Sequence, residues 1–158
     1  MNKFFVAVLI ASIIPAAALA GGIPCYDYGP YEALHLQAKA PSGVKVTPVV
    51  SSTVTMSGQS YNFPQSSSEV VASIYEIDPG VALPIHKHSF PRFGYVISGT
   101  LRVENLETGQ SVTFKSGDFI LEAVGQWHRG TNVGANSLKV LVTDVVERGK
   151  SNTELQNQ

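Results

Sequence analysis

Three of the four histidines lie in the second half of the chain, at positions that suit a shared metal ion. His86 and His88 are two residues apart, and His128 follows in a later segment. Because side chains alternate across a strand, an extended segment with this spacing projects both imidazoles from one face. A neighbouring strand that carries His128 would bring a third nitrogen to the same point. Neutral imidazoles bind Zn, Cu, Fe and Ni, and three of them leave coordination positions open for water or a substrate.

The segments that must position these histidines are short and rich in β-branched and aromatic residues. They are separated by turn sequences such as Asp-Pro-Gly, Ser-Gly and Ser-Gly-Asp, and no window among them has a helical period. This spacing predicts an all-β sandwich or barrel. The predicted strands cover residues 70–77, 92–97, 100–105, 111–114, 119–122 and 138–147.

Two sequence motifs around the histidines resemble those of the cupin superfamily. The first family motif is G-x5-H-x-H-x3,4-E-x6-G, and the second is G-x5-P-x-G-x2-H-x3-N. Residues 80–99 (GVALPIHKHSFPRFGYVISG) match the first, and residues 117–132 (GDFILEAVGQWHRGTN) match the second, with Ala123 where proline is usual. The resemblance covers about residues 70–147. It implies a double-stranded β-helix, or jelly-roll barrel, with a metal bound by His86, His88 and His128.

Arg92 stands where the first motif has glutamate, which in many cupins is the fourth metal ligand. A guanidinium is always cationic and cannot coordinate a metal. Three interpretations remain open: Arg92 faces the cavity and binds an anionic group of a substrate, it turns outward to Glu76 or Glu104, or its charge leaves a metal-free binding barrel. A divalent ion and a guanidinium about 5 Å apart repel by several kcal/mol at an effective dielectric near 20, so the first interpretation requires an anion between them.

We assign Arg92 to substrate binding on the first interpretation, together with Trp127. Trp127 adjoins a ligand histidine, where it could equally wall the cavity or cover the end of the barrel. Asp118 and Glu122 could orient an imidazole through its other nitrogen. For Asp118, simple exposure on a hairpin is the preferred interpretation.

The N-terminal residues predict export. Residues 1–20 combine Lys3, a short apolar run and a small-residue end at Ala18 and Ala20, which is typical of a signal peptide cleaved after Ala20. We expect a periplasmic or secreted protein, with no membrane attachment after cleavage. Residues 21–68 are expected to form an irregular arm with a short helix at 31–40 and an edge strand at 52–56. The barrel would span 69–148, and 149–158 would be a flexible tail.

Charge and composition limit the kinds of binding partner that we expect. After cleavage ten basic residues (11 minus Lys3) face twelve acidic ones, a net charge of about −2 with no block of one sign, so we expect no nucleic-acid partner. A small anionic molecule is the predicted ligand, and pairing into a homodimer is plausible. The one cysteine, Cys25, cannot form an internal disulfide and lies in the expected arm.

Two classes of function follow. The first is an exported metal-dependent dioxygenase, lyase or isomerase that acts on a small anionic substrate; the fold does not choose among them. The second is a non-catalytic barrel that binds or senses a small ligand or a metal. Residues 1–10 have no twin-arginine signal, so the metal would be acquired outside the cytoplasm. There the affinity order favours Zn or Cu, with Fe, Ni and Mn still open.

Overall fold

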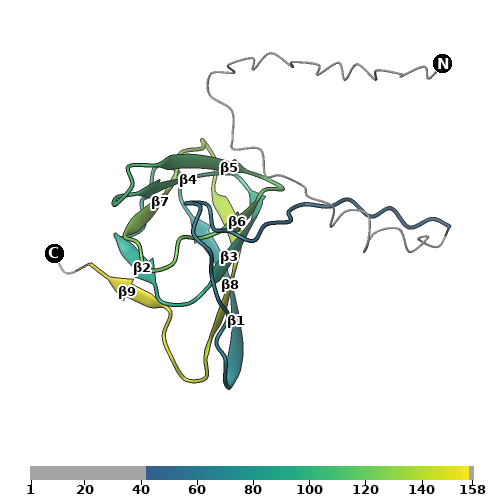
Figure 1. Cartoon of the computed structure of the whole chain (residues 1–158). Helices are drawn as coiled ribbons and strands as arrows, with labels where there is room; N and C mark the ends of the chain where they lie inside the picture. The colour runs from purple at the N-terminus through teal and green to yellow at the C-terminus, as the bar shows by residue number, and fades with distance from the viewer. Residues whose placement is uncertain (1–41, 157–158) are drawn as a thin grey trace, which may run out of the picture.

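The computed structural model describes residues 42–156, in which nine strands are arranged as a barrel (Figure 1). None of these residues forms a helix that is long and apolar enough to cross a membrane. The predicted signal peptide, the helix at 31–40, Cys25 and the first part of the arm lie outside the described residues. The strands are β1 (Ser68–Ile77), β2 (His86–His88), β3 (Arg92–Ser98), β4 (Thr100–Asn105), β5 (Ser111–Lys115), β6 (Phe119–Leu121), β7 (His128–Asn132), β8 (Leu138–Glu147) and β9 (Thr153–Leu155).

The strands form two antiparallel sheets that face each other. One sheet has the order β1-β8-β3-β6, and the other has the order β5-β4-β7-β2-β9. Consecutive strands therefore often belong to different sheets, as in a jelly roll. The prediction of an all-β jelly-roll barrel is confirmed, and each of the six predicted strands is present.

Alternation along the strands builds the core between the sheets. On β8 the side chains of Leu138, Val140 and Val142 are buried while their neighbours are exposed or half-buried, and on β4 the buried Leu101 and Val103 alternate with half-buried residues. Inward residues from both sheets meet in one hydrophobic cluster. Burial of these apolar side chains supplies the main stabilising free energy of the barrel.

Gly99 is the turn residue on which the junction between the two sheets depends. It links β3 to β4 with φ of 90°, in the left-handed region that glycine tolerates. A Cβ atom at this position would lie 2.8 Å from the Cα of Leu138. Any other residue would therefore clash with the β8 backbone, which fixes glycine at this position.

Two expectations for the ends of the domain need correction. The tail expected to be flexible at 149–158 contains β9, which pairs with β2, and Asn152 before it is buried. At 52–56 the structure has a single bridge between Val54 and Ser60 instead of an edge strand. Met56 in this stretch joins the core, although the segment is polar overall.

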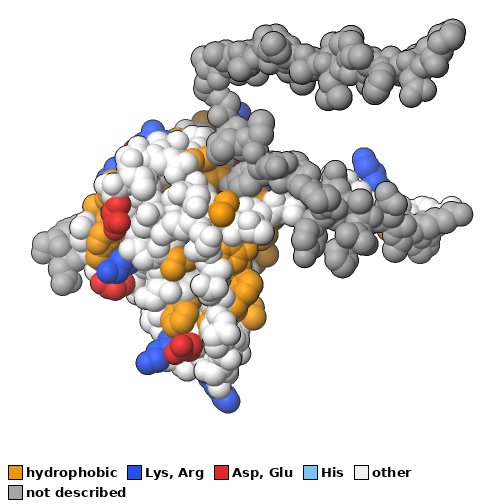
Figure 2. Space-filling model, in the orientation of Figure 1, with side chains coloured by type: hydrophobic (Ala, Val, Ile, Leu, Met, Phe, Trp, Pro, Cys, Tyr) orange, Lys and Arg blue, Asp and Glu red, His pale blue; other side chains and the backbone are white. Residues whose placement is uncertain are grey.

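The outer face of the four-stranded sheet carries exposed apolar side chains. Val70 and Ile74 of β1 are 67% and 52% exposed, and Leu141 of β8, paired with Ile74, is 37% exposed. Figure 2 shows hydrophobic side chains on the side of the molecule where β1 lies. The homodimer expected from the sequence stays a prediction.

Candidate metal centre

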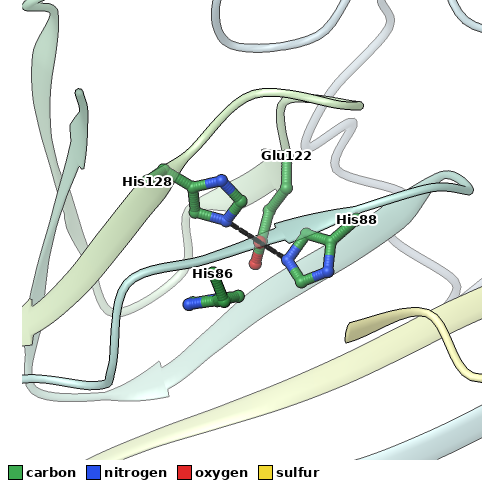
Figure 3. A group of neighbouring side chains, drawn as sticks. All are labelled: His86, His88, Glu122 and His128. Carbon is green, nitrogen blue, oxygen red and sulfur yellow. Dashed lines mark hydrogen bonds and ion pairs between the residues drawn. The ribbon is translucent and has the colours of Figure 1, made fainter. Parts of the chain in front are cut away.

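The strands bring the three histidines together inside the barrel. His86 on β2 and His128 on β7 are directly opposed in the antiparallel pair, and His88 follows on the same face of β2. All three are at most 6% exposed, and their ring centres lie 4.5 to 4.9 Å apart. The arrangement in Figure 3 is the one that alternation on two neighbouring strands predicts.

Glu122 joins the histidines from the opposite sheet. It follows β6, and its Oε2 lies 3.0 Å from Nε2 of His88 and 3.2 Å from Nε2 of His128 (Figure 3). The expectation that Glu122 orients an imidazole through its other nitrogen therefore needs correction, because it contacts the same nitrogens that converge on the centre. Gln59 bonds both the amide and the carbonyl of Val124, which anchors the loop after Glu122.

Each histidine is oriented by a backbone carbonyl. Nδ1 of His86 lies 2.7 Å from the oxygen of Pro84, and Nδ1 of His128 lies 2.8 Å from the oxygen of Gln126. Nδ1 of His88 lies 3.0 Å from the oxygen of Asn152. Since a carbonyl can only accept, each Nδ1 carries the hydrogen, and in the neutral ring Nε2 keeps its lone pair for a metal.

The spacing of the donor atoms fits one ion. The ligand atoms of His86, His88, His128 and Glu122 all lie within 4.8 Å of one another, and the Nε2 atoms of His88 and His128 are 3.2 Å apart. Ligands about 2.1 Å from a shared ion lie roughly 3.0 to 3.4 Å from each other. Two imidazole lone pairs and a carboxylate this close repel unless a cation or a proton sits between them. The residues present therefore fit a divalent transition metal.

Without a metal, bound protons relieve the repulsion between these donor atoms. Burial acts to raise the pKa of Glu122, but hydrogen bonds from His128 and His88 outweigh it and hold the pKa well below its usual range. Burial acts to lower the pKa of His128, but the hydrogen bond and charge of Glu122 raise it above the usual value. The metal-free centre therefore holds an ionised carboxylate beside a histidine that readily protonates.

His86 behaves differently. Burial, together with the neighbouring His128 and His88, lowers its pKa from 6.5 to about 4, although the bond to Pro84 opposes this. His86 is thus neutral at physiological pH, which is the form that binds a metal.

This lowered pKa makes the metal-free protein sensitive to acid. Between pH 6.5 and 4 the unfolded chain binds a proton at His86 and the folded chain does not. The free energy of unfolding therefore falls as the pH falls. From pH 7 to 4.5 we expect the wild type to lose about 2–3 kcal/mol more than His86→Gln. Urea unfolding of both proteins in chelator at the two pH values measures the difference. Equal losses would contradict the assignment to His86.

Arg92 faces the barrel interior and is held by an acidic partner on the next strand. It is 6% exposed, and its Nε and Nη2 donate to the two carboxylate oxygens of Asp144 at 2.7 and 2.8 Å. Arg92 and Asp144 are directly opposed on β3 and β8. Burial acts to lower the pKa of Arg92, but Asp144 and the charge of Glu122 raise it above the usual value. The anion that an inward arginine requires is supplied by the protein itself.

The outward interpretation of Arg92 is wrong. The two carboxylates expected to receive an outward Arg92 are paired with other residues. Oε1 of Glu76 lies 3.0 Å from Nζ of Lys139, and Oε2 of Glu104 lies 3.0 Å from Nη2 of Arg129. Nη1 of Arg92 instead lies 3.5 Å from Nε2 of His88, at the metal-binding group. The structure therefore leaves one nitrogen of the guanidinium directed at the centre.

Trp127 lies away from the centre. It precedes β7, where His128 points inward, and the ammonium of Lys87 sits 4.4 Å from the centre of its ring. Lys87 itself lies between the inward-facing His86 and His88 on β2, on the opposite face. This placement matches the alternative that Trp127 covers the barrel surface, and its assignment to substrate binding stays a prediction.

A cavity adjoins the metal-binding group. Its volume is about 420 Å³, a value that includes its opening to solvent, and His86, Arg92, Glu122 and His128 contribute to its lining. The rest of the wall is mostly apolar. The apolar side chains of the wall are those of Ile77, Leu83, Leu101, Val103, Val140 and Val142.

Asp144 and Asn152 are the residues of the site that the sequence did not reveal. Asp144 had a detectable signal, because it is the one charge among the inward positions of β8, between Val142 and Val146. Asn152 had none, since nothing in the sequence connects it to a histidine 64 positions earlier.

The comparisons with known proteins bear on the family of the barrel. A family model described as Cupin domain matches residues 73–144. No curated protein is significantly similar in sequence.

Solved structures with similarity include a polyketide cyclase from Streptomyces resistomycificus, at 20% identity and a TM-score of 0.47, covering 56% of this chain and 63% of that one. An oxalate decarboxylase from Lactobacillus farciminis, in complex with formate, has 22% identity and a TM-score of 0.47, covering 54% and 26%. A Cupin 2 conserved barrel domain protein from Salinispora arenicola has 18% identity and a TM-score of 0.44, covering 52% and 68%. This chain spans less than two thirds of the first two proteins.

Proposed function

We propose that this chain, which belongs to the cupin superfamily through its cupin domain at residues 73–144, binds one divalent transition metal beside a cavity for a small anionic molecule. The proposed ligands are His86, His88, His128 and Glu122. One observation carries the proposal: the donor atoms of these four residues converge within 4.8 Å, each imidazole with its Nδ1 at a backbone carbonyl. Such oriented ligands are what a metal site requires.

The proposed ligand of the cavity is a small carboxylate with an apolar body. Asp144 engages Nε and Nη2 of Arg92, which leaves Nη1 next to His88 as a charged donor toward the centre. A carboxylate would take its hydrogen bond there, while the apolar wall would hold the remainder of the molecule. Arg92 thus keeps the role expected of it, with Asp144 balancing its charge.

If the protein is an enzyme, the proposed reaction is of the dioxygenase, lyase or isomerase type. A bound metal would supply Lewis-acid chemistry by polarising a substrate oxygen. The chain's own residues would orient the substrate through Arg92 and exclude water through the apolar wall. Glu122, ionised by its histidine neighbours, would compensate the positive charge of the ion.

The four-donor set also supports the non-catalytic alternative. Three histidines and one glutamate would supply the four ligands that a zinc ion takes when no position is left for substrate. An ion that accepts five or six ligands would keep positions open. Coordination number in the loaded protein therefore separates the metal-binding barrel from the enzyme.

Export, if it occurs through the predicted signal peptide, bears on which ion is bound. An unfolded chain would acquire its metal outside the cytoplasm, where Zn or Cu has the advantage in affinity, although Fe, Ni and Mn also suit these ligands. We propose a periplasmic or secreted location on the residues 1–20 alone. Iron as the one stoichiometric ion in protein from its native compartment would overturn the preference for Zn or Cu.

Metal analysis and ligand titration test the proposal together. We expect one divalent ion per purified chain, and calorimetry should show straight-chain carboxylates from acetate to hexanoate binding about fourfold more tightly per added methylene, because each buried CH₂ contributes about 0.8 kcal/mol. Arg92→Lys keeps a cation for Asp144 but loses the forked donor, so it should weaken carboxylate binding about tenfold and leave the metal bound.

The methyl esters of the same acids are the matched ligand control. Since they lack the charge, they should bind weakly to both proteins. Carboxylate affinity that Arg92→Lys leaves unchanged would remove Arg92 from ligand binding. A chain that binds no divalent ion would remove the metal site.

A further inference from the structure

The C-terminal segment closes the edge of the five-stranded sheet beside the metal-binding group. β9 lies beside β2 (Figure 1), and their pairing places His86 opposite Leu155 and His88 opposite Thr153. The amide of Gln156 extends the pairing by donating to the carbonyl of Ile85 at 3.0 Å. This segment lies beyond residue 144, where the match to the cupin family model ends.

His88 depends on this segment for its orientation. The other two histidines use carbonyls two positions earlier on their own segment, at Pro84 and Gln126. His88 instead uses the carbonyl of Asn152, which is 64 positions away. The ring of His88 is therefore oriented correctly only when the C-terminal segment is docked.

The side chain of Asn152 fixes that carbonyl in place. Asn152 is 6% exposed; its Oδ1 accepts from the amide of Phe90 at 2.8 Å, and its Nδ2 donates to the carbonyl of Phe90 at 3.2 Å. Nδ2 also donates to Asp144, the partner of Arg92. One amide thus joins the β2–β3 connection to β8.

The next residue reaches the arginine itself. Nη2 of Arg92 donates to the hydroxyl of Thr153 at 3.1 Å. Asn152 and Thr153 therefore contact both members of the buried ion pair, in addition to His88. We call these two residues, Asn152 and Thr153, the C-terminal clasp.

We propose that Asn152 is a positioning residue of the metal centre, and that the C-terminal clasp sets the orientation and tautomer of His88. The inference rests on the proposed metal site. A carbonyl that accepts from Nδ1 keeps the hydrogen there, leaves Nε2 free for the ion and raises its basicity. Asn152 does not itself reach the proposed ligand positions, so it acts through His88.

Asn152→Ala in the full chain tests the clasp. It removes the bonds to Phe90 and Asp144 and so releases the carbonyl from His88. We expect Co²⁺ and Zn²⁺ to bind about 10–100-fold more weakly, as for other residues that orient metal ligands. Chelator competition measures this, and the Co²⁺ absorption spectrum should report altered coordination.

Glu154→Gln is the matched control. It breaks the ion pair between Lys87 and Glu154, whose side chain is exposed, and leaves the Asn152 contacts in place. Metal affinity should stay at the wild-type value. Asn152→Ser, which perturbs the packing less, should weaken metal binding in the same direction and serves if the alanine variant does not fold.

Nitrogen NMR of the metal-free proteins separates this inference from the proposed function. In the wild type Nδ1 of His88 should carry a hydrogen that is bonded to the carbonyl of Asn152, and in the Asn152 variants the NMR signal of that hydrogen bond should be lost. If that change occurs but the wild type binds no metal, the clasp still positions His88 and the metal proposal fails. A wild-type Nδ1 hydrogen-bond signal for His88, together with wild-type metal affinity, in folded Asn152 variants would overturn the clasp.

Discussion

Asp144→Ala is expected to lower the free energy of unfolding by about 3–5 kcal/mol, because it leaves the guanidinium of Arg92 buried without its counter-ion. Arg92 is 6% exposed, and its Nε and Nη2 donate to the two carboxylate oxygens of Asp144 at 2.7 and 2.8 Å. The guanidinium would then face the histidines without the charge that balances it. Urea unfolding of the metal-free proteins at pH 7 measures the loss.

Two further variants show whether the effect belongs to the buried pair. Replacing both partners, Arg92→Met with Asp144→Leu, should recover most of the lost stability, because no unpaired charge remains. Glu76→Ala breaks the pair with Lys139 on the neighbouring strands, where both side chains are about half exposed, and should cost less than about 1 kcal/mol. A loss for Asp144→Ala no greater than that of Glu76→Ala would contradict the prediction.

Glu122→Ala is expected to abolish stoichiometric metal binding, and Glu122→Gln to weaken it by about 100-fold or more. The amide keeps the shape of the side chain but loses the negative charge that compensates the ion. Since residues that only orient ligands already change affinity by about 10–100-fold, a ligand should do at least as much. Chelator competition with Zn²⁺ and Co²⁺ on the purified proteins gives the affinities.

Asp118→Asn provides the control for charge on the same part of the chain. Asp118 precedes β6, accepts a bond from the amide of Lys115 and is not part of the metal-binding group. Its replacement should leave metal affinity unchanged. If Glu122→Gln also bound metal with wild-type affinity, the carboxylate would not be a ligand and the site would rest on three histidines.

The strands that the sequence predicted are those whose apolar alternation is strong. β8 alternates buried and exposed positions along its length, and its predicted bounds of 138–147 agree with the structure. β7 was not predicted as a strand of its own, because its inward positions are His128, Gly130 and Asn132, which carry no apolar signal. β9 is exposed throughout and only three residues long, so pairing with β2 decides its structure and local sequence does not.

The same distinction applies to the site: local spacing predicts some of its residues, whereas pairing between distant strands places the others. The shared face of His86 and His88 followed from their spacing on a strand, which is a local property, whereas the place of His128 was implied by the resemblance to the cupin motifs. The partner of Arg92 did not, because Asp144 lies 52 positions away and is brought opposite by strand pairing. The missing glutamate of the first motif was therefore interpreted as a lost ligand, whereas Glu122, directly after β6, places a carboxylate at the centre.

The backbone carbonyls that hold the imidazoles have a consequence for how this site can change in evolution. Pro84, Gln126 and Asn152 each present a main-chain oxygen, which every amino acid possesses. A mutational scan would then find the histidines intolerant but the exposed position 84 permissive. The backbone conformation orients these ligands, so their orientation can be preserved where the side chains at these positions change. Sequence identity alone therefore underestimates how well the site is preserved.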